Sequence, residues 1–144
     1  MATSCRFCRI VAGEEPATVV LDDDDFLAFL DVRPLFHGHT LLVPKVHQGT
    51  LTDLPVDLVG PLFGRARWLA AAMEGALGSQ GSFVAVNNKV SQSIPHLHVH
   101  VVPRTRGDGL RGFFWPRTRY APGEADEVAT RLRSWLATND PPAP

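Results

Sequence analysis

The sequence predicts an α+β fold, an antiparallel sheet of about five strands with helices packed on one side of it. Several short runs rich in β-branched and aromatic residues are separated by turn residues, which is typical of antiparallel strands. Residues 95–103 alternate histidine with leucine or valine between two prolines, the clearest strand pattern in the chain. Two segments, within 52–77 and at 124–136, repeat apolar residues at helical spacing.

Composition fits one globular domain. The 144 residues are 44% hydrophobic and 20% charged, as in ordinary proteins with a buried core. Fourteen Lys and Arg balance 15 Asp and Glu, so no global charge signal points to nucleic acid or a membrane surface. We expect a single domain over residues 1–144, with its core at about 5–104 and a C-terminal arm and helix at 105–138.

The cellular location is predicted from three features: membrane-spanning segments, a secretory signal and the cysteine pattern. No apolar run approaches the roughly 20 residues of a membrane span. Residues 1–9 lack the long apolar core of a secretory signal. The two cysteines, Cys5 and Cys8, are too close together for a secreted disulfide framework. We therefore expect a cytoplasmic protein.

The first part of the chain predicts a short helix and three strands. Four consecutive aspartates, residues 22–25, interrupt the strand runs. They form either a cation site or a solvated hairpin turn, and we favour the turn. Pro44 ends the third strand, because proline cannot continue a sheet ladder. The predicted elements are a helix within residues 5–14 and strands at 18–21, 26–30 and 39–43.

A long helix follows, and its start is ambiguous. Thr52 or Asp53 is a suitable N-cap residue. However, Gly60-Pro61 would kink a helix interior, so we place the true start nearer Gly60. Gly78 and Gly81 are suited to end the helix. The elements predicted after it are a strand at 82–87, a polar loop at 88–94, the histidine strand and a last helix at 124–136.

Three histidines in the strand pattern predict a functional site. Successive side chains of a strand point to opposite faces, so His96, His98 and His100 share one face. The intervening Leu97, Val99 and Val101 then face the core. The alternative is a half-exposed strand that happens to carry histidines, but three in register make that interpretation weaker.

The run His96-Leu97-His98-Val99-His100-Val101-Val102 resembles the signature of the histidine triad family of nucleotide hydrolases and transferases. The resemblance covers residues 5 to about 104. It implies this family's sheet and a homodimer that joins two such sheets. Further matches in the family's order are Phe7 through Pro16-Ala17, Ala28 to Asp31, Gly38-His39, Pro44 to His47, Asn87 and Ser91 to Ser93.

The resemblance assigns His98 as a nucleophile that forms a nucleotidyl-histidine at the α-phosphate. It makes His100 a contact of the phosphate or leaving group, and His39 a supporting histidine. Imidazole suits this chemistry because its unperturbed pKa is about 6.5 and neighbouring imidazoles disfavour each other's protonation. The implied substrates are purine nucleotides: nucleoside phosphoramidates, aminoacyl adenylates or dinucleoside polyphosphates.

Two other functions remain open from the residues. One is a nucleotide-binding regulatory module whose turnover is incidental. The other is a zinc hydrolase in which the three strand histidines bind a catalytic metal. Against the second, the outer histidines of such a strand lie about 13 Å apart. Ligands of one zinc must approach it to about 2 Å, so all three cannot converge.

The nucleotide contacts are also implied by the resemblance. Asp31 matches the acid that accepts hydrogen bonds from the ribose hydroxyls, although loop capping is an alternative role. An apolar slot for the base predicts weak base discrimination. Neutral side chains near the triad would follow charge that develops on phosphoryl oxygens. The slot residues are Phe7, Ile10, Phe29 and Val32, and the neutral donors are Asn87, Gln92 and Ser93.

Cys5-x-x-Cys8 is by itself ambiguous between a redox motif, half of a metal site and two buried thiols. Family members with this cysteine pair add two histidines to hold a structural zinc. The resemblance therefore implies a zinc ion bound by Cys5, Cys8, His47 and His96, in the zinc-containing branch. His96 would then be unavailable for proton transfer.

Residues 104–120 form an arginine-rich arm that holds Phe113, Phe114 and Trp115, with Asp108 as its only acid. One interpretation is a basic lip that meets polyphosphate, a base or an acidic partner. The other is an irregular arm whose aromatic residues pack or form a subunit interface. We favour the second. The sequence as a whole gives no strong nucleic-acid signal.

Overall fold

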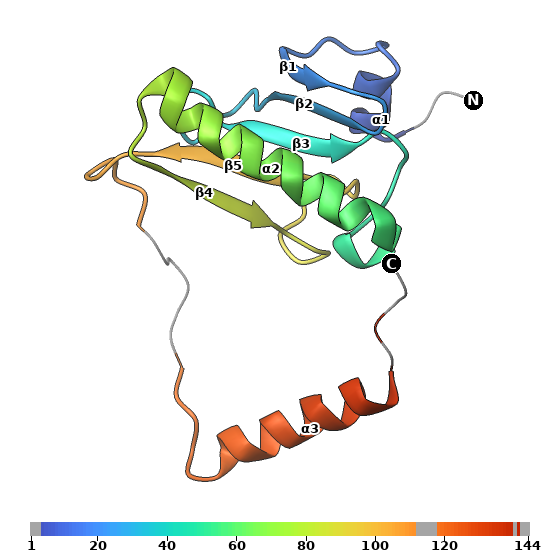
Figure 1. Ribbon diagram of the computed structural model, residues 1–144, viewed down its shortest axis with the longest axis vertical. Coiled ribbons are helices and arrows are strands. Elements are labelled where there is room, and N and C mark those ends of the chain that lie inside the picture. The colour runs from blue at the N-terminus through green and yellow to red at the C-terminus, as the bar shows by residue number, and fades with distance from the viewer. Residues whose placement is uncertain (1–3, 112–117, 140, 142–144) are drawn as a thin grey trace. The chain divides into compact units, whose positions relative to one another are not determined.

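The computed structural model describes residues 4–111, 118–139 and 141, which fall into two compact units, Met1–Asp108 and Gly109–Pro144. The first unit carries the whole sheet, and the second carries one helix (Figure 1). The aromatic part of the predicted arm, Phe113 to Trp115, lies outside the described residues. That the chain forms a single domain stays a prediction.

One antiparallel sheet of five strands confirms the predicted fold class. The strand order is β1-β2-β3-β5-β4, so β5 (Val99–Arg104), which contains the last histidine of the run, lies between β3 and β4. His100 pairs with Leu41 on one side and with Ala85 on the other. The strands are β1 (Val19–Asp22), β2 (Phe26–Leu30), β3 (Thr40–Pro44), β4 (Gly81–Val86) and β5 (Val99–Arg104).

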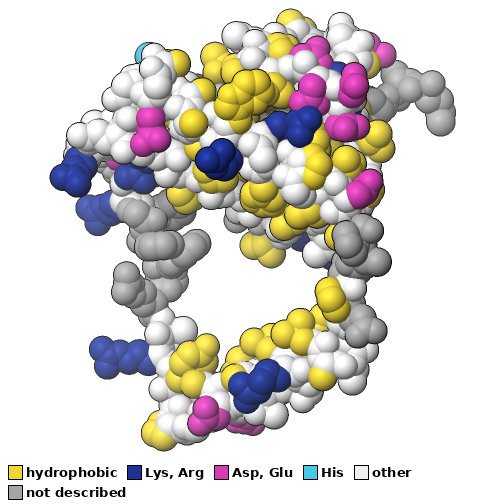
Figure 2. Space-filling model, viewed as in Figure 1, with side chains coloured by type: hydrophobic (Ala, Val, Ile, Leu, Met, Phe, Trp, Pro, Cys, Tyr) yellow, Lys and Arg dark blue, Asp and Glu magenta, His cyan; other side chains and the backbone are white. Residues whose placement is uncertain are grey.

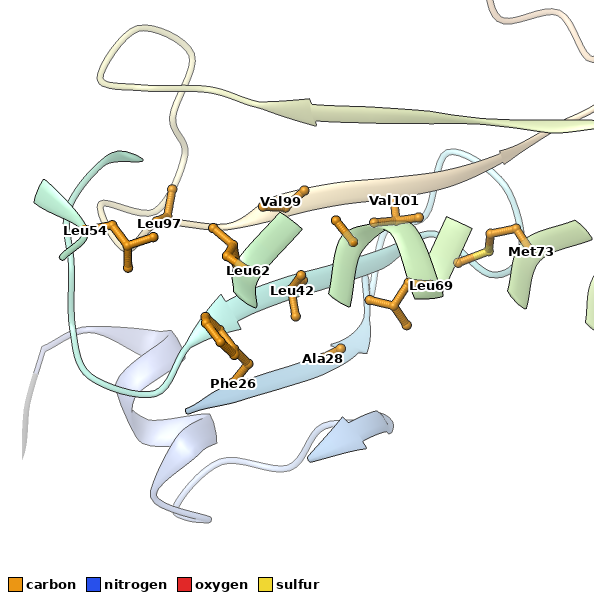
Figure 3. Packing of buried hydrophobic residues seen from close by; sticks show 11 residues of the cluster. Phe26, Ala28, Leu42, Leu54, Leu62, Leu69, Met73, Leu97, Val99 and Val101 are labelled. Carbon is orange, nitrogen blue, oxygen red and sulfur yellow. The ribbon is translucent and has the colours of Figure 1, made fainter. Parts of the chain in front are cut away.

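The two faces of the sheet are covered by different helices. Alternate residues of β2 belong to two separate hydrophobic clusters, Phe26 to one and Phe29 to the other. The long helix α2 (Val56–Leu77) packs in the first cluster, which Figure 3 shows. The short helix α1 (Arg6–Val11) packs in the second. The prediction that the helices lie on one side is therefore wrong for α1. β2 and β3 are apolar on both faces, and each face needs cover.

Helix α2 begins at Val56, so the prediction of a start nearer Gly60 is wrong. Pro61 lies inside the helix, where packing of the apolar stripe outweighs one missing hydrogen bond. Of the two predicted caps, Asp53 serves a preceding 3₁₀ turn (Leu51–Asp53), in a capping box with Thr50. Gly78 ends α2 with φ 68°, as predicted.

The four aspartates form a hairpin turn, as we favoured. Asp23 Oδ1 accepts hydrogen bonds from the backbone N–H groups of Asp25 (3.0 Å) and Phe26 (2.9 Å). The other oxygen of Asp23 pairs with Arg65 of α2 at 2.6 Å. This ion pair ties the β1–β2 turn to the helix across the first cluster.

Strand β5 begins at Val99, three residues later than the histidine pattern predicts. Before it, the N–H of Leu97 donates to the carbonyl of Gln48, which belongs to no strand. The side-chain alternation nevertheless extends over the whole run. Leu97, Val99 and Val101 all lie in the core beneath α2.

The second unit contains α3 (Glu124–Thr138), which confirms the last predicted helix. Leu132, Trp135 and Leu136 of this helix are exposed. Figure 2 shows hydrophobic side chains at the surface along it.

In the first unit, Arg104 of the predicted basic arm pairs with Asp108 at 2.6 Å. No helix of the described residues is long and apolar enough to cross a membrane.

Candidate functional site

The histidines of the run 96–100 belong to two different clusters of titratable side chains. His96 joins Cys5, Cys8 and His47, and the four ligand atoms lie within 4.8 Å of one another. His100 joins His39 and Asp31 with the same closeness. His98 lies between the clusters, and its ring centroid is 4.9 Å from that of His100.

The distances in the Cys5/Cys8/His47/His96 cluster fit a tetrahedral metal. His96 Nδ1 lies 3.4 Å from the sulfur of Cys5 and 3.5 Å from that of Cys8, and His47 Nδ1 lies 3.2 Å from the sulfur of Cys8. Zinc binds sulfur at about 2.3 Å and imidazole nitrogen at about 2.0 Å, so sulfur and nitrogen ligands of one tetrahedron lie about 3.5 Å apart. The four side chains are therefore spaced as zinc ligands.

The protonation state of His96 also suits a metal ligand. Its Nε2 lies 2.8 Å from the carbonyl oxygen of Pro44. A carbonyl only accepts, so Nε2 carries the proton and the lone pair of Nδ1 faces the two sulfur atoms. Metal-bound histidines are usually held by such a hydrogen bond through their other nitrogen. Burial lowers the pKa of His96, which favours the neutral ring that a metal requires.

His98 is held in the tautomer that a nucleophile needs. Its Nδ1 donates to the backbone carbonyl of His96 at 2.8 Å, so the lone pair is on Nε2. The ring is only 4% exposed. The edge-to-face packing of Phe7 against it, with ring centroids 5.2 Å apart, limits its rotation. His98 can therefore attack an electrophile through Nε2 without first losing a proton.

In the Asp31/His39/His100 cluster, the two histidines form a hydrogen-bond chain with the backbone of Leu35, and the carboxylate of Asp31 lies beside it. The backbone N–H of Leu35 donates to His39 Nδ1 at 3.0 Å, so a neutral His39 carries its proton on Nε2. That N–H lies 3.0 Å from His100 Nδ1 and 3.7 Å from Asp31 Oδ2. His100 Nδ1 then accepts, and the proton of His100 is on Nε2. In this state His39 Nε2 carries a proton and has no lone pair to offer, so it is not arranged to bind a metal ion.

Both histidines of this chain are neutral at pH 7. Burial, together with His98 and His39, lowers the pKa of His100 to about 4. Burial also lowers the pKa of His39, although the carboxylate of Asp31 opposes the effect. His100 can therefore donate a hydrogen bond from Nε2 to a phosphoryl oxygen or a leaving group without carrying a positive charge.

A cavity of about 590 Å³ opens beside His98 and His100. This volume is typical of a site for a small molecule. Asp31 also lines it, and one oxygen of its carboxylate accepts the backbone N–H of Arg33 at 2.8 Å. Eight of the predicted nucleotide contacts line this cavity: Phe7, Ile10, Phe29, Asp31, Val32, Ser93, His98 and His100.

Three predicted site residues do not line the cavity. His39 lies behind His100, where it supports the ring through the hydrogen bond described above. Gln92 donates to the carbonyl of Gly49 at 2.6 Å and accepts from the N–H of Lys89 at 2.9 Å, so it braces its own loop. Asn87 is exposed at the end of β4. A contact of Asn87 or Gln92 with substrate stays a prediction.

Several residues that line the cavity have no predicted role in the site. Arg6 and Arg33 each stand next to a predicted base contact, Phe7 and Val32, and this adjacency is the signal that could have found them. Pro16 and Ala17 complete the apolar part of the lining, and Ala17 packs against the second hydrophobic cluster. The lining residues without a predicted role are Arg6, Pro16, Ala17, Leu30, Arg33, Leu41 and Ile94.

Two named enzymes are similar to this chain in sequence. Adenylylsulfatase HINT3 of Arabidopsis thaliana is 37% identical over 112 residues, 76% of this chain and 57% of that protein, so the chain spans little more than half of this relative. Adenosine 5'-monophosphoramidase hnt1 of Schizosaccharomyces pombe is 28% identical over 136 residues, 90% of this chain and 99% of that protein.

A solved structure is also similar over nearly the full chain. The zinc-bound histidine triad family protein from Mycobacterium smegmatis has a TM-score of 0.72 and 36% identity, over 92% of this chain and 97% of that one. The model of the HIT domain family matches residues 12–107, which hold the sheet, α2 and the histidine run. This chain belongs to the HIT domain family.

Proposed function

We propose that this protein is a nucleotide hydrolase or nucleotidyl transferase that cleaves purine nucleotides at the α-phosphate. The observation that carries the proposal is the hydrogen bond from His98 Nδ1 to the carbonyl of His96, which leaves the Nε2 lone pair to a residue that lines the cavity. Two relatives bear the names adenylylsulfatase and adenosine 5'-monophosphoramidase, which supports cleavage of a bond to the α-phosphate of a purine nucleotide.

The reaction has two displacement steps. In the first, the lone pair of His98 Nε2 forms a bond to the α-phosphorus, and the leaving group departs with the electrons of its bond to phosphorus and takes up a proton from solvent. In the second, water attacks the same phosphorus and loses a proton to solvent, the P–N bond breaks with its electrons returning to His98 Nε2, and the nucleotide 5'-phosphate is released. Another acceptor in place of water gives nucleotidyl transfer. His98 returns to its starting tautomer, because its proton stays on Nδ1, where it is hydrogen-bonded to the carbonyl of His96.

The other site residues position the substrate. His100 Nε2–H and the hydroxyl of Ser93 donate to phosphoryl oxygens, where negative charge grows during each displacement. Asn87 is proposed as a further donor. Asp31 accepts hydrogen bonds from the ribose. The base lies in the apolar slot of Phe7, Ile10, Phe29 and Val32.

We further propose a structural zinc ion bound by Cys5, Cys8, His47 and His96, which places the chain in the zinc-containing branch. The spacing of the four ligand atoms and the zinc-bound relative from Mycobacterium smegmatis support it. When bound, the zinc cross-links the N-terminal helix to the segments that follow β3 and precede β5, and it takes no part in the displacement steps. A homodimer and a cytoplasmic location complete the proposal.

The experiment is intact-mass spectrometry of the protein after an acid-free quench with adenosine 5'-phosphoramidate. We expect an adenylyl adduct on the wild type and none on His98→Ala, which still binds AMP but has no measurable turnover. His37→Ala is the matched control, because His37 is exposed and belongs to neither cluster, and it should form the adduct at the wild-type rate. Turnover in His98→Ala would contradict the mechanism. A wild type that binds AMP without consuming the substrate would instead favour a regulatory module.

A further inference from the structure

The apolar slot of the cavity has an arginine at its edge. Arg6 lines the cavity together with Phe7 and Ile10 of the same helix, and its side chain is 44% exposed. Its Nε donates to Glu15 at 2.8 Å. Glu15 directly precedes Pro16 and Ala17, which line the apolar part of the cavity. The guanidinium of Arg6 is therefore held beside the slot in which the proposed function places the base.

Most of the hydrogen-bonding capacity of Arg6 is available to a ligand. Within the described residues, the bond from Nε to Glu15 is the only hydrogen bond of its side chain. The two terminal nitrogens carry four further N–H groups. Glu15 also accepts from Arg9 at 3.2 Å, so one carboxylate is shared between two positive charges. The edge of the slot thus presents fixed donors and a surplus of positive charge.

Such donors distinguish purine bases. Guanine and hypoxanthine present two acceptors, O6 and N7, on one edge, whereas adenine presents the acceptor N7 beside the donor N6. A guanidinium has donors only, and two of them match the pair O6 and N7. Against adenine, one of these donors would face the amino group without a partner. An apolar slot alone offers little such discrimination.

We propose that Arg6 reads the base, and that its guanidinium donates to O6 and N7 of a 6-oxopurine, so that the cavity prefers guanine or hypoxanthine nucleotides to adenine nucleotides. This inference rests on the proposed function for the position of the base. Weak base discrimination was predicted from the apolar residues of the slot alone. With the donors of Arg6 at its edge, we expect strong discrimination instead.

The test is isothermal titration calorimetry of the full-length, zinc-loaded protein with GMP, IMP and AMP. We expect GMP and IMP to bind about tenfold more tightly than AMP, in the range of one bidentate arginine–guanine contact. Agreement between IMP and GMP assigns the effect to O6 and N7, because IMP lacks the 2-amino group. Arg6→Met should bring the affinity ratio of GMP to AMP close to one, mainly by weakening GMP.

The matched control is Arg9→Met. Arg9 lies on the same helix and bonds to the same Glu15, but it does not line the cavity, so its loss should leave the ratio at the wild-type value. The proposal is overturned if the wild type binds AMP as tightly as GMP. It is also overturned if Arg6→Met keeps the wild-type ratio, or if Arg33→Met alone removes it.

Failure of this inference and failure of the proposed function give different results. These nucleotides carry no bond for His98 to cleave, so the titrations do not depend on turnover. Equal affinity for the three nucleotides would overturn the role of Arg6 and leave the covalent mechanism standing. A guanine preference without an adduct from either purine phosphoramidate would overturn the covalent mechanism alone. No binding of any of the three would overturn both.

Discussion

The Cys5/Cys8/His47/His96 cluster and the Asp31/His39/His100 cluster each contain two histidines, and the possible ligand atoms of each lie within 4.8 Å of one another, yet the structure prepares the histidines for different chemistry. In the first, a backbone carbonyl takes the Nε2 proton of His96, and the lone pair faces two sulfur atoms. In the second, a backbone N–H takes the Nδ1 lone pair of His39, and a proton faces the next histidine.

The difference teaches that the presence of a histidine in such a cluster does not by itself decide what that histidine offers to a ligand. Each imidazole has one donor and one acceptor nitrogen when neutral, and the backbone group that meets one nitrogen determines what the other offers. A carbonyl behind the ring makes a metal ligand, and an N–H behind the ring makes a hydrogen-bond donor. His98, with a carbonyl behind it, presents a lone pair as His96 does, but it faces the cavity.

The largest expected effect comes from removing one thiolate of the first cluster. In Cys8→Ser we expect the zinc content to fall from about one per chain to near zero. The free energy of unfolding should fall by roughly 3–5 kcal/mol, because zinc binding contributes directly to folding. Metal analysis and urea unfolding measure the two. The control is Asp31→Asn in the second cluster, which should keep its zinc. Equal metal loss in both variants would contradict the distinction between the clusters.

The second cluster should make stability depend on pH. The pKa of His100 is about 4 in the folded protein, against an ordinary value of 6.5. Between these pH values His100 is protonated in the unfolded chain but not in the folded chain. Its contribution to the free energy of unfolding is therefore fully present above pH 6.5 and is lost as the pH falls towards 4. The fall attributable to His100 is about 3 kcal/mol at most.

Urea unfolding of the wild type and His100→Gln between pH 4.5 and 7 measures this effect. The variant should lose less stability across the range, although some loss persists because burial also lowers the pKa of His39 and His96. The zinc content determined at each pH separates the effect from metal release. An identical pH slope in the two proteins would show that His100 is not buried in its neutral form.

The smallest expected effect tests the hydrogen-bond chain itself. In His39→Gln, His100 loses the N–H that holds its proton on Nε2. We expect kcat to fall roughly 30-fold, as for the loss of an orienting partner, with the zinc content unchanged. Nitrogen-15 NMR of the His100 ring should show a mixture of tautomers in the variant and the Nε2–H form in the wild type. An unchanged kcat together with an unchanged tautomer would contradict the chain.

The sequence predicted the elements whose signals are local. The alternation around His98, the acidic turn between β1 and β2 and the glycine that ends α2 all depend on neighbours within a few residues. The errors came from competition between distant parts. Asp53 served a 3₁₀ turn, and Pro61 was tolerated because the α2 stripe packs on the sheet. α1 packs on the face of the sheet opposite to α2, because both faces of β2 are apolar.

The sequence by itself determined which chemical groups the protein has: a cysteine pair, a histidine at every second position of residues 96–100, and an acid directly after a strand. Only the tertiary structure decided what each group presents to a ligand. The carbonyl of Pro44 and the N–H of Leu35, which orient His96 and His39, lie in other segments of the chain. An imidazole is chemically ambiguous until such a backbone group binds one of its nitrogens, and only folding brings that group to the ring.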